Sequence, residues 1–200
     1  MSRLKNFRIG GLVAIGALLL VGVLLAGGLA WEKWQGGAPS VKIGGPFQLV
    51  DTRDGKTVTD QNFKGKWLLV YFGYTHCPDA CPTALNDLSL ALDKLGDKRQ
   101  AMAPLFITID PERDTADVMK DYVASFAPDI VGLTGSTDQI GQAEKEYRVY
   151  AAKHPTKDGG YDMDHSSIIY VMDPSGRFVT NFTHETDPDQ MAAKLMSLAS

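Results

Sequence analysis

The sequence predicts an α/β domain in which helices flank a mixed central sheet, preceded by an N-terminal transmembrane helix. First, apolar strands alternate with helical stretches along most of the chain, which is typical of a sheet buried between layers of helices. Second, the apolar strand Trp67–Phe72 leads through a loop to the only two cysteines of the chain, Cys77 and Cys81, at the start of a helix. Third, no residue between Ile9 and Ala30 carries a charge.

The uncharged stretch from Ile9 to Ala30 has 22 residues. At about 1.5 Å per residue, a helix of this length crosses a bilayer core. Basic residues at positions 3, 5 and 8 precede it and should stay in the cytoplasm, while Trp31 and Trp34 suit the opposite interface. The following domain is therefore expected to be exported. A cleaved signal peptide is the alternative, but its apolar region is usually shorter, about 7–15 residues.

These features divide the chain into residues 1–35 as cytoplasmic tail and anchor, 36–45 as tether and 46–200 as the folded domain. The whole chain has a net charge of −4, and residues 1–38 contain four basic residues and one acidic residue, so the exported part carries −7. An acidic domain without a basic stripe argues against binding to nucleic acid.

The elements of the domain follow from apolar periodicity and from turn and cap residues. The sequence predicts a hairpin, a strand–helix–strand unit, a helix, a third strand, another helix, a closing hairpin and a final helix. The expected strands are Phe47–Val50, Thr57–Thr59, Trp67–Phe72, Ala103–Ile109, Ile130–Thr134, Ser167–Met172 and Arg177–Phe182. The expected helices begin near Pro82, at Thr115, at Thr137 and at Asp187-Pro188. The second helix is expected to end at about Phe126, the third, capped by Thr137 or Asp138, at Val149, and the last at Leu198. Residues 153–164 are expected to form a loop.

This order is similar to a thioredoxin-like fold. A central strand delivers cysteines to a helix start, and a hairpin followed by a helix closes the domain. In open α/β sheets, ligand chemistry lies beyond the carboxyl ends of the strands, where Cys77 and Cys81 are expected. Asp110 ends the neighbouring strand on the same side.

The cysteine pair has three possible roles: a structural disulfide, a dithiol redox centre, or two thiolate ligands of a metal. A helix N-terminus stabilises a thiolate over a thiol. Because proline disrupts a helix interior, we expect the regular helix to begin near Pro82-Thr83, with the cysteines on the preceding turn and Asp79 accepting hydrogen bonds there. Two residues four apart on such a turn have Cα atoms about 6 Å apart, which allows either a disulfide or a shared ion.

His165 is the candidate third ligand. Thioredoxin-like oxidoreductases place a cis-proline before the strand that opens the closing hairpin, whereas the corresponding run here, Tyr161–Ser167, contains no proline. On this topology His165 would face the two sulfurs. Two thiolates and one imidazole suit copper(I) and can accommodate copper(II), whereas zinc would need a fourth ligand. The alternative is a loop histidine with a structural hydrogen bond.

Other candidate residues have lesser expected roles. His76 is placed to tune the thiolate of Cys77 or to hydrogen-bond the loop, and His154 and His184 are expected at the surface. Met163 is a candidate soft auxiliary ligand, but a packed side chain or a passing contact in copper transfer is favoured.

Asp110 is expected in a loop beside the site, tied down by Arg113 through a charge-assisted hydrogen bond rather than acting as a ligand.

Several motifs together resemble the Sco (SenC) family of copper-binding proteins over about residues 40–200. They are Gly73–Pro82 (GYTHCPDACP), Ile109–Thr115 (IDPERDT), Val131–Gly135 (VGLTG), Tyr147–Tyr150 (YRVY) and Asp164–Ser166 (DHS). The resemblance implies a thioredoxin-like fold that binds copper through Cys77, Cys81 and His165. It also implies a role in maturing the binuclear copper centre of cytochrome c oxidase, by delivering copper, by reducing target cysteines, or both.

The expected function is therefore that of a membrane-anchored copper metallochaperone. Its expected partners are the copper-bearing subunit of cytochrome c oxidase or another copper chaperone. The alternative is a periplasmic thiol-disulfide reductase with Cys77 and Cys81 as catalytic residues, and a redox or copper sensor is a weaker alternative. A purely structural disulfide is least favoured, because so short a loop gains little. The short basic N-terminus without an Arg/Ser-rich presequence favours the bacterial inner membrane, with the domain in the periplasm, over the mitochondrial inner membrane facing the intermembrane space.

Overall fold

The computed structural model describes residues 42–199. Residues 42–200 form one compact unit. The predicted anchor at 9–30 and most of the predicted tether lie outside the described residues. Within residues 42–199, no helix has both the length and the apolar character needed to cross a membrane.

A seven-stranded sheet forms the centre of the domain, with the strand order β2-β1-β5-β4-β3-β8-β9. Strands β3, β4 and β5 are parallel, and the other pairings are antiparallel, so the predicted mixed sheet is confirmed. The strands are β1 (Gln48–Asp51), β2 (Thr57–Thr59), β3 (Trp67–Gly73), β4 (Met102–Thr108), β5 (Val131–Thr134), β8 (Ile168–Met172) and β9 (Phe178–Thr183).

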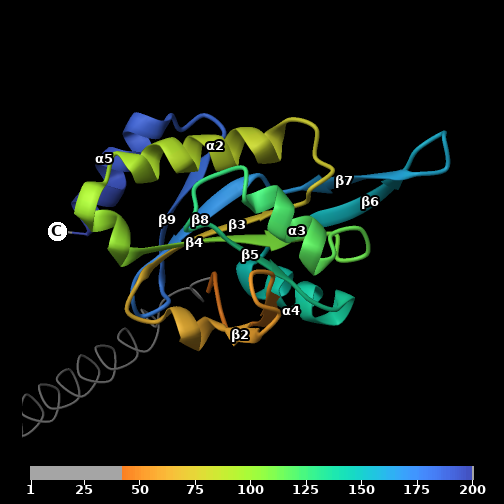
Figure 1. Ribbon diagram of the computed structural model, residues 1–200, viewed down its shortest axis with the longest axis horizontal. Helices are drawn as coiled ribbons and strands as arrows, with labels where there is room; N and C mark the ends of the chain where they lie inside the picture. The colour runs from red at the N-terminus through yellow and green to blue at the C-terminus, as the bar shows by residue number, and fades with distance from the viewer. Residues whose placement is uncertain (1–41, 200) are drawn as a thin grey trace, which may run out of the picture. The chain divides into compact units, whose positions relative to one another are not determined.

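Helices cover both faces of this sheet (Figure 1). On one face, α2 packs against α5, and Tyr122 of α3 contacts Phe106 of β4. On the other face, Tyr147 of α4 packs against Phe72 of β3. The helices are α2 (Ala80–Asp93), α3 (Ala116–Val123), α4 (Thr137–Tyr147) and α5 (Pro188–Leu198), with short 3₁₀ helices at Asp60–Phe63 and Gly96–Ala101.

Strand β3 is buried on both faces because it lies between β4 and β8 and beneath helices on either side. This explains its continuous apolar run, which is typical of a central strand rather than an edge strand. Among the described residues, the buried hydrophobic cluster extends from Phe47 to Leu195.

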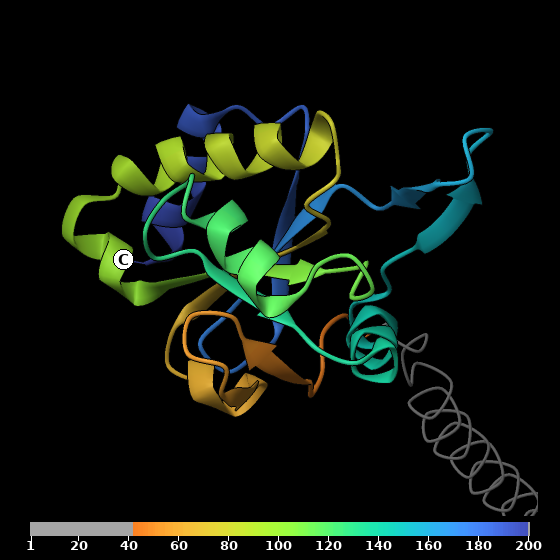
Figure 2. The same cartoon turned by 45° about the vertical axis from the view of Figure 1, so that its right-hand side comes forward.

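A second, two-stranded sheet projects from the domain (Figures 1 and 2). Strands β6 (Ala151–Pro155) and β7 (Tyr161–His165) pair as an antiparallel hairpin. The prediction of a loop over residues 153–164 is therefore wrong. Most side chains of this hairpin are exposed or half-buried, so it lacks the apolar alternation by which a half-buried strand is identified. Pairing between the two strands, rather than burial, holds it together.

The helix caps agree only in part with the expected ones. Thr115 caps α3 by accepting a hydrogen bond from the backbone N–H of Val118, as predicted, although α3 ends at Val123. For α4, however, the cap is Ser136, which forms a capping box with Gln139. The predicted caps of α4 lie one and two residues too late, because Ser136 is the last residue with extended backbone before the helix.

Candidate metal centre

The two cysteines lie at the junction between the central strand β3 and helix α2. Strand β3 ends at Gly73, and helix α2 begins at Ala80, with Asp79 at the cap position. Cys81 therefore lies in the first helical turn and is fully buried, whereas Cys77 precedes the helix and is half-buried. The helix begins earlier than predicted. Pro82 is tolerated in it because the first helical N–H groups have no intrahelical acceptor.

The sulfur of Cys77 satisfies one of the free backbone groups at the start of α2. The backbone N–H of Cys81 donates a hydrogen bond to Cys77 Sγ at 3.3 Å. The prediction that Asp79 accepts hydrogen bonds from this turn is met only in part: its carboxylate accepts from the hydroxyl of Thr83, at 3.4 Å, but does not cap a backbone N–H. The sulfur of Cys77 thus accepts a hydrogen bond from a backbone N–H at the helix start, a role that the side-chain oxygen of a cap residue usually has.

His165 is the last residue of β7, and its side chain faces the cysteines. Its Nε2 lies 3.5 Å from Cys81 Sγ. The sulfurs of Cys77 and Cys81 and a ring nitrogen of His165 all lie within 4.8 Å of one another, and this is the one such group of three potential ligands among residues 42–199. The prediction that His165 faces the two sulfurs is therefore confirmed for its position.

The ring of His165 is fixed from two sides. Its Nδ1 lies 3.2 Å from the backbone carbonyl oxygen of Ser166. Because a carbonyl oxygen only accepts, Nδ1 carries a proton, and Nε2 is the ring nitrogen that faces Cys81. Tyr71 and Tyr74 contact the imidazole edge-on, with ring centroids 6.2 Å and 5.9 Å away. This arrangement resembles that of a metal-binding histidine oriented by a hydrogen bond from its other nitrogen.

The two cysteines have opposite protonation preferences. A hydrogen bond from the Cys81 side chain, with further N–H donors from Cys81 and Asp79, lowers the pKa of Cys77 to about 5 despite partial burial. The interaction with the Cys77 thiolate, together with burial, raises the pKa of Cys81. At neutral pH the pair therefore holds a single proton, which resides on Cys81. Cys77 is a thiolate that reaches solvent.

Gly73 leaves room for the buried sulfur. A Cβ atom at this position would lie 2.7 Å from Cys81 Sγ and 2.8 Å from Cε2 of Phe106. Both distances are below any normal carbon contact, so only glycine allows Cys81 to pack against the end of β3.

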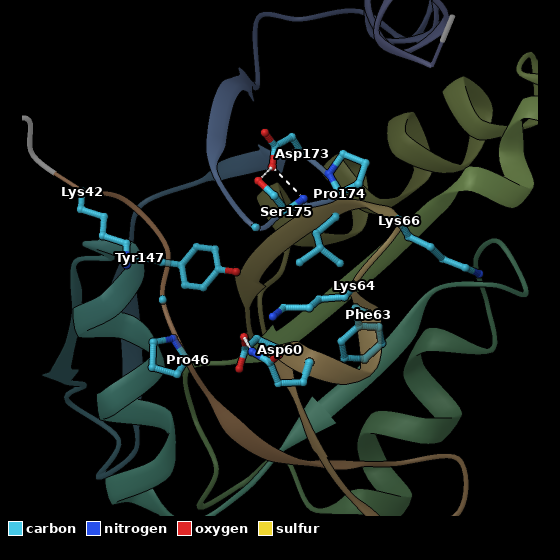
Figure 3. A pocket seen from close by; sticks show the side chains of 14 residues that line it. Lys42, Pro46, Asp60, Phe63, Lys64, Lys66, Tyr147, Asp173, Pro174 and Ser175 are labelled. Carbon is cyan, nitrogen blue, oxygen red and sulfur yellow. Dashed lines mark hydrogen bonds between the residues drawn. The ribbon is translucent and has the colours of Figure 1, made fainter.

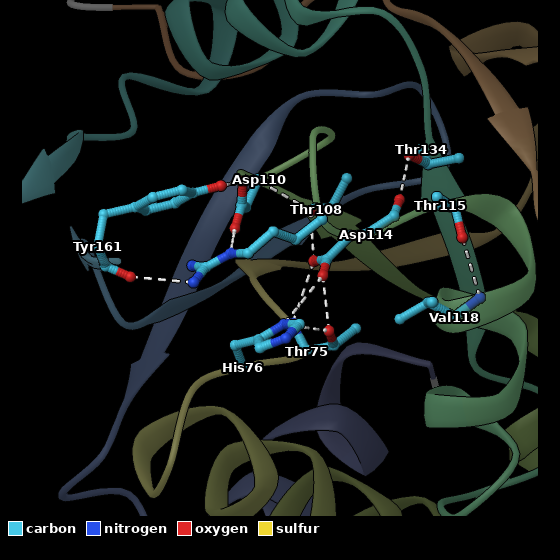
Figure 4. Close-up of polar contacts among 10 residues, drawn as sticks. Thr75, His76, Thr108, Asp110, Asp114, Thr115, Val118, Thr134 and Tyr161 are labelled. Carbon is cyan, nitrogen blue, oxygen red and sulfur yellow. Dashed lines mark hydrogen bonds and ion pairs between the residues drawn. The ribbon is translucent and has the colours of Figure 1, made fainter. Parts of the chain in front are cut away.

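A polar network joins the hairpin that carries His165 to the loop after β4 (Figure 4). The hydroxyl of Tyr161 donates to the buried carboxylate of Asp110 at 2.7 Å. Arg113 donates to the same carboxylate through Nε and to the backbone oxygen of Tyr161 through Nη1, at 2.9 Å. Its guanidinium also lies over the Tyr161 ring, 3.9 Å from the centroid. The predicted brace between Arg113 and Asp110 is confirmed, and it reaches β7.

Asp114 is a site residue that the sequence did not single out. It is completely buried and accepts hydrogen bonds from the backbone N–H of Thr75 at 3.0 Å, the Thr75 hydroxyl at 2.6 Å and the Thr108 hydroxyl at 2.7 Å (Figure 4). These contacts hold the cysteine loop against the end of β4. The signal for this role was weak, because an aspartate just before a helix cap is ordinarily a surface residue.

The remaining candidates lie outside the group of three ligands. His76 hydrogen-bonds Thr75 within the loop, at 3.1 Å. His154 is exposed on the hairpin and lies 3.0 Å from a carboxylate oxygen of Asp164, and His184 is also exposed. Met163 is buried, as expected for a packed side chain.

Residues 35–200 match the family model described as SCO1/SenC. The chain is 43% identical over 155 residues to the mitochondrial SCO1 homolog 1 of Arabidopsis thaliana, covering 77% of this chain and 46% of that protein. It is 40% identical over 156 residues to the mitochondrial SCO1 homolog of Homo sapiens, covering 76% and 52%. The chain thus spans about half the length of these curated relatives.

Solved structures share the fold. The structure of Bradyrhizobium japonicum ScoI with copper bound is 50% identical, with a TM-score of 0.73, and the match covers 78% of this chain and 99% of that one.

Proposed function

Because this chain belongs to the SCO1/SenC family, we propose that it is a membrane-anchored copper metallochaperone that serves assembly of the binuclear copper centre of cytochrome c oxidase. The observation that carries this proposal is the convergence of two sulfurs and one imidazole nitrogen within 4.8 Å. The copper-bound structure of a chain 50% identical to this one supports copper as the metal.

The donor set itself favours copper. Thiolate and imidazole ligands are soft to borderline, and a site with three of them suits copper(I). A structural zinc site would need a fourth ligand, and among the described residues no other histidine, cysteine or carboxylate joins the group. We propose Cys77, Cys81 and His165 as the ligands of copper, which is the cargo of the protein.

The protonation states suggest how copper is taken up and released. Cys77, a half-buried thiolate, is the ligand that an incoming ion or acceptor meets first. Cys81 must lose its proton before it can bind, because its pKa is raised. Transfer then proceeds by exchange of one ligand at a time. Oxidation of the pair to a disulfide would remove two of three ligands, so redox state would gate loading.

The proposed setting follows the sequence features. Residues 1–35 would form the cytoplasmic tail and anchor, residues 36–45 the tether, and residues 46–200 the copper-binding domain. The domain would lie in the periplasm of a bacterial inner membrane, with a mitochondrial inner membrane facing the intermembrane space as the alternative. The partner would be the copper-bearing subunit of cytochrome c oxidase or another copper chaperone.

A transfer assay tests the function. The copper(I)-loaded domain is mixed with the soluble copper-bearing domain of the oxidase subunit, and metal in each protein is measured after separation. Copper should move to the acceptor from the wild-type protein. Retention of copper by the wild-type domain, with an acceptor that takes up free copper, would contradict the proposal.

A thiol-disulfide reductase is the second candidate, favoured by the low pKa of Cys77 beside a protonated Cys81. In this reaction the Cys77 thiolate attacks a target disulfide and releases one target thiolate. Cys81, after losing its proton, then attacks the Cys77 sulfur and releases the second. The target gains two electrons, and the pair becomes a disulfide. With copper excluded, undiminished reduction of the acceptor's disulfide by a His165→Ala protein would favour this enzyme over the chaperone.

A further inference from the structure

A cavity of about 170 Å³ lies at the end of the sheet opposite the cysteines (Figure 3). The cysteine loop follows the last residue of β3, whereas this cavity borders the segment that enters β3, at Lys66 and Leu68. The turn between β8 and β9, around Pro174, and Tyr147 of α4 complete its walls. The copper site uses none of these residues.

Tyr147 presents its hydroxyl to this cavity. Its side chain is almost completely buried, with 2% of its surface exposed, yet its hydroxyl points into the cavity. No hydrogen bond joins that hydroxyl to any of the described residues, and it opens onto the cavity, so solvent or a ligand can reach it. Burial and the nearby charge of Asp60 raise the pKa of Tyr147, so the group stays protonated and donates. A ligand with an acceptor oxygen would take a hydrogen bond from it in place of water.

Cationic side chains surround the same cavity. Lys42, Lys64 and Lys66 line it, all are exposed, and none forms an ion pair with the described residues. The ammonium group of Lys64 points into the cavity near the Tyr147 hydroxyl, while that of Lys66 points away (Figure 3).

Of the two carboxylates in the lining, one is already neutralised. Asp173 pairs with Arg177 at 2.8 Å, whereas Asp60 has no cationic partner among the described residues. The cavity therefore has a positive excess within a domain that is acidic overall. An ammonium and a hydroxyl donor that converge on one space suit a phosphate group.

We propose that this cavity binds the phosphate of an anionic lipid headgroup and so seats the domain on the membrane surface. The source of the phosphate follows from chain connectivity. Lys42 lines the cavity, and residues 31–41 link it to the end of the predicted anchor at Ala30. Eleven residues span at most about 40 Å when fully extended, so an anchored domain keeps this cavity within reach of headgroups. Seated in this way, the domain would hold the cysteine end of the sheet away from the bilayer.

The test uses the protein of residues 42–200, the compact unit that contains the buried cluster from Phe47 to Leu195. Its flotation with phosphatidylglycerol vesicles is compared with its flotation with phosphatidylcholine vesicles at low salt. We expect binding to the anionic vesicles only. Lys64→Gln and Tyr147→Phe should each weaken it about five-fold, the effect of losing one lysine or one hydrogen bond at such a surface. Lys157→Gln, which removes a charge at the tip of the β6–β7 hairpin, is the matched control and should bind as wild type.

Equal binding by wild type and Lys64→Gln would overturn the proposal, and so would equal binding to both kinds of vesicle. Calorimetric titration with inorganic phosphate separates a lipid from a soluble ligand, since tight phosphate binding without vesicle binding would also overturn it. Lys64 is exposed, so its variant keeps the test decisive even if Tyr147→Phe is unstable. Copper affinity of Lys64→Gln should equal that of wild type, which separates this inference from the proposed function.

Discussion

Cys81 and His165 are 84 positions apart in sequence, yet Cys81 Sγ lies 3.5 Å from His165 Nε2. One residue belongs to the first turn of α2, and the other to the last position of β7. Nδ1 of the imidazole donates to a backbone carbonyl oxygen, so Nε2 is the ring nitrogen that faces the cysteines. With copper bound, Cys81 Sγ and His165 Nε2 would both turn to the metal.

Copper binding should release one proton near neutral pH. Cys77 is already ionised above about pH 5, whereas the raised pKa of Cys81 keeps its thiol protonated. A metal displaces that proton, so the apparent affinity should rise about ten-fold per pH unit between about pH 7 and 8. Competition against a copper(I) chelator of known pH dependence measures the slope. A slope of zero would mean that both sulfurs are ionised before copper arrives.

The two thiols should differ in reactivity. In the reduced domain, Cys77 should be alkylated by iodoacetamide with a midpoint near pH 5, while buried Cys81 stays unmodified. Replacing Cys81 by alanine removes the side-chain donor that stabilises the Cys77 thiolate, so the pKa of Cys77 should rise. Mass spectrometry of digests across a pH series gives both midpoints. An unchanged midpoint in Cys81→Ala would show that the Cys81 side chain does not lower the pKa of Cys77.

Gly73→Ala should disrupt the packing of Cys81 against the end of β3. The added Cβ would overlap Cys81 Sγ and Phe106, so we expect destabilisation of about 1–3 kcal/mol and weaker copper binding. Gly141→Ala is the matched control, because a Cβ there meets nothing within 4 Å and the position lies inside helix α4. That variant should be more stable by about 0.5–1 kcal/mol. Urea unfolding of both proteins distinguishes the two effects, and equal stabilities would show that the space at Gly73 can open freely.

Tyr161→Phe should loosen the hairpin that carries His165. The change leaves the buried Asp110 carboxylate without one of its donors, which costs about 1–3 kcal/mol. Copper affinity should fall about ten-fold, in the range seen when a group that orients a metal ligand is lost. Tyr150→Phe is the control, since Tyr150 lies just before β6 and is 59% exposed. If both variants bind copper as wild type does, the network does not position His165.

The parts of the structure predicted well are those in which burial controls the sequence. Strand β3 is apolar throughout because it is covered on both faces, and its run into the cysteines followed from that pattern. The placement of His165 followed from topology, since the segment before the closing hairpin must approach the helix start. Neither inference needed knowledge of particular side-chain contacts.

The parts missed depend on contacts that leave little trace in a single sequence. The β6–β7 hairpin is held by strand pairing and by the Tyr161 network, without an apolar face. Asp114 is buried only because three donors from Thr75 and Thr108 surround it, and those partners lie in other segments. The start of α2 was placed too late, because a proline in the first helical turn costs little.

The ligand set is the central claim, and X-ray absorption of the copper(I)-loaded domain tests it most directly. Wild type should show two sulfur ligands and one nitrogen ligand, and His165→Ala should lose the nitrogen. The copper affinity of His165→Ala should fall by more than the ~10–100-fold loss that is typical when a residue that supports a ligand is removed. His154→Ala, on the same hairpin but paired with Asp164 at the surface, should keep the wild-type spectrum and affinity. An unchanged spectrum and affinity in His165→Ala would contradict the account.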